Sequence, residues 1–196
     1  MKSRLLKIKL LLGLVVSSLF LSTPVFPQGG WLDEIMGAIA YILITVAAFG
    51  RVWSSAYIVG KKDNMLVMKG PYSVTRNPLY FFSFIGFLGI GLATESIVIS
   101  LIMMLIFFGT HWPTILEEEE KLKILFGEKY RSYLDRVPRF LPKIARVGHP
   151  KALNANSRIF TKSVVDNAIL AMSFGLIQLC EWLHAKHYLP SLFTIL

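Results

Sequence analysis

The chain has 196 residues, of which 54% are apolar, and its apolar runs are broken only by short polar stretches. This composition excludes an ordinary soluble globule and indicates one compact membrane domain. The formal net charge of +9 is spread between the apolar runs, which suits anionic lipid headgroups and topology control better than nucleic acid. We therefore expect an all-α, polytopic bundle of about five transmembrane helices that binds no nucleic acid.

Residues 1–30 combine a basic start with an apolar stretch from Leu10 to Phe26. Signal peptides and retained signal anchors share this pattern. Residues 22–26 lack a small-x-small cleavage site, which favours a retained first span. Both readings bring the chain to the far side of the membrane.

Four further apolar segments are predicted to cross the membrane. The second span runs from about Trp31 to Phe49, and the last covers about 164–183. Between them, 78–93 and 97–116 form a hairpin with a short polar tip. The same-side ends of this hairpin should therefore lie close together.

Basic residues set the expected orientation. All Lys and Arg residues except Lys186 lie in 1–30, in the loop 51–76 or in the polar region 121–162. The positive-inside rule assigns these segments to the cytoplasm. We expect a multi-pass protein of the inner or plasma membrane, with its N-terminus inside and its C-terminus outside.

The foot of the third span carries a potential anion site. Pro78 suits the first position of a helix, which makes Asn77 the N-cap and places Arg76 directly before it. Free backbone N–H groups and one guanidinium would then point into the same small volume. A capped helix with an interfacial Arg is the alternative interpretation.

The acidic run Glu117–Glu120 follows the fourth span directly. It has one simple explanation, a solvated helix face in which Glu117 pairs with Lys121 and Glu119 pairs with Lys123. That spacing leaves Glu118 and Glu120 without a basic partner. A carboxylate facing Arg76 across the hairpin would instead make a pocket with a cationic and an anionic end, suited to a zwitterion such as an amino acid group.

Three motifs occur in a fixed order. Residues 64–80 read Asn-Met-Leu-Val-Met-Lys-Gly-Pro-Tyr-Ser-Val-Thr-Arg-Asn-Pro-Leu-Tyr, residues 118–133 read Glu-Glu-Glu-Lys-Leu-Lys-Ile-Leu-Phe-Gly-Glu-Lys-Tyr-Arg-Ser-Tyr, and residues 139–142 read Arg-Phe-Leu-Pro. Together they resemble the integral-membrane methyltransferases that include isoprenylcysteine carboxyl methyltransferase and the phospholipid N-methyltransferases. The resemblance divides the chain into the N-terminal segment 1–30, a methyltransferase-like core 31–142 and a basic linker with an extra helix, 143–196.

The resemblance implies a cytoplasmic pocket for S-adenosyl-L-methionine and a lipid-like or amphiphilic acceptor that is methylated on a carboxylate or amine. Arg76 would bind the cofactor's carboxylate, and Glu118 or Glu119 its ammonium. Arg139 would orient an acceptor carboxylate or phosphate, although a structural anchoring role is equally compatible. The implied catalytic residues are Arg76 and Arg139. The implied cofactor-binding residues are Asn64, Leu66, Gly70, Tyr72, Arg76, Asn77, Pro78, Tyr80, Glu118 and Glu119.

The chain departs from the family pattern where Asn64 and Asn77 replace histidines, so proton uptake at these positions is lost. No metal is expected: Cys180 is the single cysteine, and His184 and His187 lack a third ligand nearby. A non-catalytic relative, such as a membrane assembly factor or a reductase-like protein with the same fold, is the alternative function.

Overall fold

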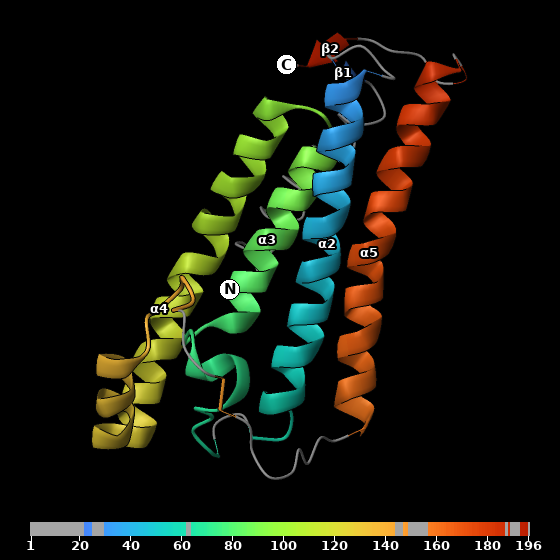
Figure 1. Cartoon of the computed structure of the whole chain (residues 1–196). Helices are drawn as coiled ribbons and strands as arrows, with labels where there is room; N and C mark the ends of the chain where they lie inside the picture. Colours follow the sequence, from blue (N-terminus) through green and yellow to red (C-terminus); the bar gives the residue numbers. More distant parts are fainter. Residues whose placement is uncertain are drawn as a thin grey trace, which may run out of the picture. The chain divides into compact units, whose positions relative to one another are not determined.

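The computed structural model of the chain describes residues 22–24, 30–61, 64–143, 147–148, 157–186, 188 and 193–195. Its helices are α2 (Trp31–Ile58), α3 (Pro78–Ala93), α4 (Ile97–Arg136) and α5 (Ser157–Ala185), with a 3₁₀ turn η1 (Gly70–Ser73) before α3 (Figure 1). The strands β1 (Ser22–Pro24) and β2 (Phe193–Ile195) pair in parallel. Apart from this short pair, the predicted helical class is confirmed. The predicted first span in 1–30 falls almost entirely outside the described residues.

Among the described residues, two helices are long and apolar enough to cross a membrane. They are α2, over Glu34–Ile58, and α4. Helix α3 is a shorter apolar helix of 16 residues. Two of the predicted spans are thus supported by length and composition, and the number five stays a prediction.

Two helices extend beyond the predicted spans. Helix α2 continues past Phe49 to Ile58, and α5 begins at Ser157, before the predicted start of the last span. Arg51 does not end the helix, and its side chain has two partners: Nε donates to Asn167 Oδ1 at 2.8 Å and Nη1 donates to Ser83 Oγ. A paired guanidinium can remain inside a helix that the sequence pattern would end there.

The predicted hairpin of α3 and α4 is confirmed, with its tip at 94–96. The tip is buried, and Glu95 adopts a left-handed backbone with φ of 51°. The Ser96 hydroxyl accepts a hydrogen bond from the backbone N–H of Ile99 at 3.2 Å and so caps the start of α4. A Cβ at Gly91 would lie 2.7 Å from the Ser100 Cα atom, so the two helices can approach this closely only at a glycine.

The chain divides into two compact units, which share the four helices. Unit 1 comprises 1–45, 86–110 and 170–196. Its described core is apolar and made of small and aliphatic side chains with one aromatic ring. These residues are Ala40, Ala93 and Ile177, with Ile90, Leu92 and Phe174 packed against them.

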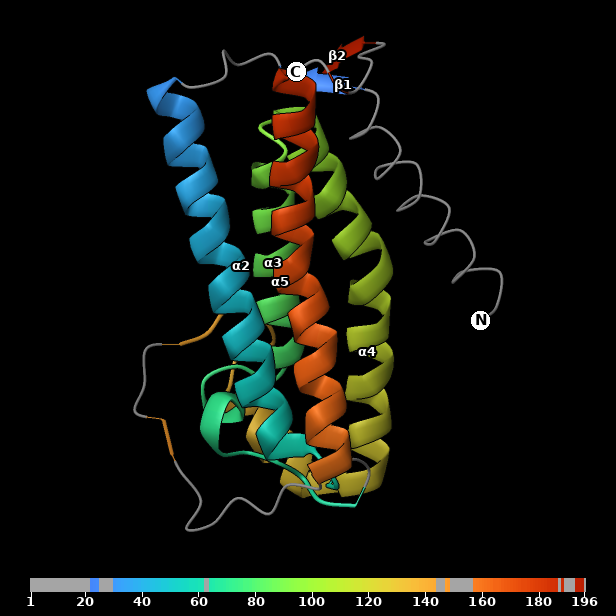
Figure 2. The same cartoon turned by 90° about the vertical axis from the view of Figure 1, so that its right-hand side faces the viewer.

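Unit 2 comprises 46–85 and 111–169, and it holds every site residue that the sequence predicted. Within this unit α4 breaks at Gly127, which has φ of 49° and ψ of −128°. Figure 1 shows the segment after Gly127 turning back beside the helix before it. Figure 2 shows the parts of α2 and α5 that belong to this unit side by side, where Arg51 bonds to Asn167.

Because α4 turns back at Gly127, residues before and after this glycine pack together in the core of unit 2. This core is apolar with two tyrosine rings: Leu66, Tyr130, Tyr133 and Val137 are buried, and Met68, Leu122, Phe126 and Leu134 pack against them. Through Leu66 and Met68, the loop before α3 packs against the end of α4.

Candidate functional site

The turn η1 is held in one conformation by several contacts. Gly70 has φ of +65°, and a Cβ there would lie 2.2 Å from the Tyr57 ring, so only glycine fits. The Ser73 hydroxyl donates to the Gly70 carbonyl at 2.7 Å. The Tyr133 hydroxyl donates to the Tyr72 carbonyl at 2.6 Å. Gly70 therefore serves the shape of the loop, and Tyr72 is fixed through its backbone.

The segment that follows α4 returns along the residues that precede α3. The backbone N–H of Arg76 donates to the Pro138 carbonyl at 2.9 Å, and that of Lys143 donates to the Val74 carbonyl at 3.0 Å. The buried Thr75 hydroxyl lies 2.9 Å from the Phe140 carbonyl oxygen. Thr75 was not predicted as a site residue, because its partners are far away in the sequence.

The predicted start of α3 is confirmed. The helix begins at Pro78, and the Asn77 carbonyl accepts the N–H of Phe81 at 2.9 Å, as an N-cap residue does. The Asn77 side-chain amide donates to Glu119 Oε1 at 3.3 Å and to the Arg139 carbonyl at 3.0 Å. The side chain of the N-cap residue thus links the start of α3 to the Glu119 carboxylate and to the segment after α4.

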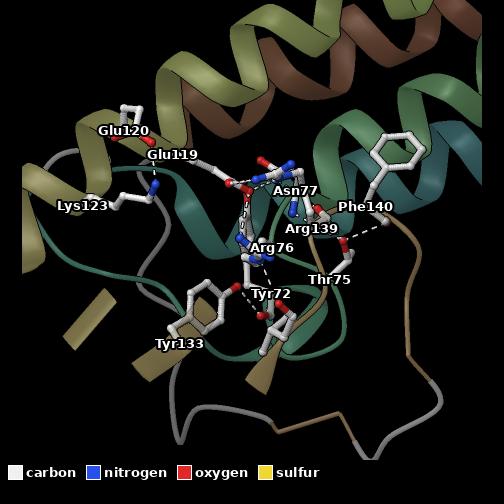
Figure 3. Close-up of polar contacts among 11 residues, drawn as sticks. Tyr72, Thr75, Arg76, Asn77, Glu119, Glu120, Lys123, Tyr133, Arg139 and Phe140 are labelled. Atoms are coloured by element: carbon white, nitrogen blue, oxygen red, sulfur yellow. Dashed lines mark hydrogen bonds and ion pairs between the residues drawn. The ribbon is translucent and has the colours of Figure 1, made fainter. Parts of the chain in front are cut away.

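Glu119 joins three side chains from two distant segments (Figure 3). Its Oε1 accepts from Arg76 Nη1 at 3.2 Å and from Asn77, and its Oε2 accepts from Nε and Nη2 of Arg139, both at 3.0 Å. Arg76 Nε also donates to the Val137 carbonyl at 2.8 Å. Only 2% of Glu119 is exposed, and two guanidiniums offset the loss of solvation of its carboxylate.

This arrangement corrects the predicted pairing of Glu119 with Lys123. Lys123 pairs with the exposed Glu120 instead. One residue along a helix turns the side chain by about 100°, so neighbouring glutamates of the run face different surroundings. Glu117 and Glu120 are exposed to solvent, whereas Glu119 is buried, so only part of the acidic run is a solvated helix face.

A cavity of about 380 Å³ lies in unit 2 beside this cluster. It is lined by Ile58, Met65, Leu66, Val67, Tyr72, Arg76, Asn77, Pro78, Leu79, Tyr80, Thr114, Glu117, Glu118, Lys121, Leu122, Tyr130 and Tyr133. Seven of the predicted cofactor-binding residues are in this lining, namely Leu66, Tyr72, Arg76, Asn77, Pro78, Tyr80 and Glu118. The lining does not include Asn64, Gly70, Glu119 or Arg139. Asn64 is exposed, and the other three shape the surrounding structure.

The cavity presents charges of both signs and an apolar wall. Arg76 and Lys121 are cationic, and Glu117 and Glu118 are anionic. The Glu118 carboxylate hydrogen-bonds to the side chain of Tyr80, so the two ends of the predicted hairpin do meet. A zwitterion that also carries a flat apolar ring fits such a lining.

Arg139 lies on the other side of the Glu119 carboxylate from Arg76. Its guanidinium carbon lies 5.9 Å from the centroid of the Trp112 ring, within the range of a cation–π contact. The side chain is 39% exposed. These contacts hold the Arg139 side chain in place. Its contact with an acceptor stays a prediction.

Within the described part of the chain, no three His, Cys, Asp or Glu side chains lie close enough to hold a metal ion. His184 Nδ1 lies 2.9 Å from the Cys180 carbonyl oxygen. His187, considered as its partner, lies outside the described residues.

Comparison with known proteins agrees with the motifs. Residues 35–129 match the sequence model of the phospholipid methyltransferase family. The chain is also 28% identical over 140 residues to the cobalt-zinc-cadmium resistance protein CzcN of Cupriavidus metallidurans, covering 71% of this chain and 64% of that protein. It is 28% identical over 166 residues to the nickel-cobalt-cadmium resistance protein NccN of Alcaligenes xylosoxydans xylosoxydans, covering 82% and 78%.

No solved structure matches the chain. The matched segment falls within the predicted core 31–142 and contains the cavity's principal residues Tyr72, Arg76 and Glu118. The resemblance to membrane methyltransferases is thus confirmed through the match of residues 35–129 to the phospholipid methyltransferase family.

Proposed function

We propose that the protein is a membrane-embedded methyltransferase that uses S-adenosyl-L-methionine to methylate a carboxylate or amine on an amphiphilic acceptor. One observation carries this proposal. Arg76 and Glu118, from two separate family motifs, line the same cavity within the segment that matches the family. Opposite charges at one cavity suit the amino acid part of this cofactor.

The residues present fit the cofactor. Arg76 and the N-terminus of α3 would hold its carboxylate, and Glu118 its ammonium group. Leu66, Val67 and Leu122 offer an apolar surface for the adenine ring. When bound, the cofactor supplies an activated methyl group on a sulfonium ion.

The protein's part in the reaction is to align the reactants and exclude water. The cluster of Glu119, Arg76 and Arg139 fixes the loop before α3 against the segment after α4, which makes the cavity wall rigid. Asn77 supplies an amide where the family has histidine, so its side chain can orient groups without taking up a proton.

The acceptor is proposed to reach the site from the membrane. Apolar side chains line much of the cavity, and Met65 on this lining is 59% exposed. The distribution of basic residues supports a site at the cytoplasmic face of the inner or plasma membrane. A lipidated acceptor should therefore be methylated more efficiently than its water-soluble head group, because each buried CH₂ contributes about 0.8 kcal/mol to binding.

The similar proteins CzcN and NccN are named for metal resistance, which favours a second candidate function. In that reading the chain keeps the methyltransferase fold and acts without catalysis, for example in the assembly of a resistance system. The two candidates differ in one respect that can be measured, the transfer of a methyl group.

The test uses membranes from cells that express the full chain, the Glu118→Gln variant or the Glu120→Gln variant. Incubation with S-adenosyl-L-methionine labelled in its methyl group should transfer label to membrane lipid or amphiphile in the parent and in Glu120→Gln. The Glu118→Gln variant should lose most of this transfer. Equal labelling in membranes with and without the protein would reject the enzyme and favour the non-catalytic candidate.

A further inference from the structure

The segment that follows α4 carries an apolar side chain on the protein surface. Leu141 is 71% exposed, and its neighbours Pro142 and Lys143 are exposed as well. A single exposed leucine means nothing by itself, because isolated apolar residues are common on protein surfaces. The surroundings of Leu141 indicate what covers it.

The ring of Phe140 fixes the level of this segment along the helices. It contacts the rings of Phe81 and Phe84 on α3, with centroid distances of 5.9 and 5.8 Å, and the ring of Trp112 on α4 at 6.1 Å. Trp112 precedes Glu117 by five residues, a rise of about 7 Å along the helix. Phe140 therefore packs against the apolar part of α4, before the acidic run begins.

The backbone on both sides of Leu141 is fixed. The Thr75 hydroxyl lies 2.9 Å from the Phe140 carbonyl oxygen, and the Lys143 N–H donates to the Val74 carbonyl at 3.0 Å. In Figure 3 the Phe140 carbonyl faces Thr75, while its ring points away from that residue. Leu141 is thus held at the surface between two anchored neighbours, next to a ring that packs on apolar helices.

This level is where lipid headgroups meet acyl chains. Helix α4 is long and apolar enough to cross a membrane, and the charged run that starts at Glu117 marks where it enters water. A tryptophan shortly before that point is typical of the membrane interface. Apolar side chains of interfacial segments enter the leaflet to a depth of about 5–10 Å. Leu141, beside Phe140, is placed to do so.

The charge of the segment fits an anionic lipid surface. Residues 139–143 contain two cations and no carboxylate. The exposed Lys143 donates from Nζ to the carbonyl of Arg136, whose own side chain is also exposed. Basic side chains beside an inserted apolar residue attract the phosphate groups of anionic phospholipids.

We propose that residues 139–143 are a membrane-surface anchor, which inserts Leu141 into the leaflet beside α3 and α4 and places Lys143 among the phosphate groups of anionic phospholipids. The partner of this surface is a lipid bilayer and not a second protein. The inference does not depend on methyl transfer. It matters for the site because Arg139, within the anchor, binds the carboxylate of Glu119.

The experiment attaches a fluorescent label to the Leu141→Cys variant of the full chain, in nanodiscs of phosphatidylcholine and phosphatidylglycerol. One quencher is a lipid with a nitroxide near the top of its acyl chain, and the other is iodide in the water. The nitroxide should quench this label, and iodide should have little effect on it. The native Cys180 is buried and should take up no label, which the parent chain verifies.

Ile124→Cys is the matched control. Ile124 is 85% exposed and also belongs to unit 2, but it lies beyond Glu117 on α4 and should therefore be in water. Its label should be quenched by iodide and not by the nitroxide. Omission of phosphatidylglycerol should reduce the nitroxide quenching of the Leu141→Cys label, because the attraction of Lys143 to the lipid surface is then lost.

Several results would overturn the anchor. Iodide quenching of Leu141→Cys as strong as that of Ile124→Cys would place both labels in water, and equal nitroxide quenching would remove the distinction between the two positions. Nitroxide quenching that ignores phosphatidylglycerol would contradict the role of Lys143. A Leu141→Cys chain with a lower Tm in detergent would show that this side chain packs within the protein. None of these results affects the proposed function.

Discussion

Glu118 and Glu119 are adjacent in the sequence, but they have opposite surroundings in the structure. Glu119 is 2% exposed and accepts hydrogen bonds from Arg76 and Arg139, whereas Glu118 lines the cavity and hydrogen-bonds to Tyr80. We therefore expect Glu119 to contribute to stability and Glu118 to ligand binding. The predictions below separate these two roles.

The Glu119→Gln variant should be less stable than the parent. A neutral amide leaves two guanidiniums without their shared carboxylate, and such a loss typically costs about 3–5 kcal/mol when the pair is buried. Because the Arg139 side chain is 39% exposed, we expect the lower end of this range. Thermal unfolding in detergent measures the effect. Glu120→Gln, which alters only an exposed pair with Lys123, should unfold like the parent, and equal Tm values for both variants would contradict the assignment.

Thr75→Val tests the contact between the loop before α3 and the segment after α4. Valine keeps the shape of the side chain and removes the hydroxyl that reaches the carbonyl groups of Phe140 and Arg139. The loss of this buried hydrogen bond should reduce the free energy of unfolding by about 1–3 kcal/mol. Thr75→Ser, which retains the hydroxyl, is the control and should recover most of the difference. A Thr75→Val protein with the parent's Tm would show that this hydroxyl does not join the two segments.

Gly70→Ala and Gly60→Ala form a matched pair. Both glycines have positive φ, +65° and +76°, so both substitutions introduce backbone strain of about 1–2 kcal/mol. Only at Gly70 would the new Cβ lie 2.2 Å from a ring carbon of Tyr57, whereas nothing lies within 4 Å of it at Gly60. Gly70→Ala should therefore lower the Tm clearly more than Gly60→Ala does. Similar losses for the two variants would mean that Tyr57 does not pack against the turn.

Much of the site could be predicted from the sequence because its signals are local. Asn77 and Pro78 mark the start of α3 through backbone chemistry that depends on neighbouring residues only, and the structure confirms this start. The approach of Tyr80 and Glu118 followed from the short hairpin between two apolar helices. Seven of the predicted cofactor-binding residues accordingly line one cavity.

The rest depended on contacts between distant segments, which spacing does not reveal. Glu119 appeared to pair with Lys123 because both lie on one helix, but the return of Arg139 from beyond the break at Gly127 determines its true partner. The contact of Arg51 with Asn167 was missed for a similar reason. Its partner Asn167 lies 116 residues away, on a helix outside the segment that matches the family.

The pKa of Tyr72 predicts a dependence of stability on pH. Burial raises this pKa in the folded state above the usual value of about 10, so the folded protein keeps the phenol neutral while the unfolded chain ionises it. Its contribution to stability is fully present below about pH 10 and is lost as the pH rises further. The Tyr72→Phe variant lacks this loss, so its Tm should rise relative to that of the parent between pH 9 and pH 11. A constant difference across that range would contradict the raised pKa.

The central claim is that the cavity binds an S-adenosyl compound through Arg76 and Glu118, and calorimetric titration with S-adenosylhomocysteine tests it most directly. The folded parent should bind one equivalent. Glu118→Gln should weaken binding about ten- to a hundredfold, because it removes a charge-assisted hydrogen bond of about 1.5–3 kcal/mol, and Glu120→Gln should bind like the parent. No binding to the folded parent, or the same affinity in all three proteins, would contradict the account.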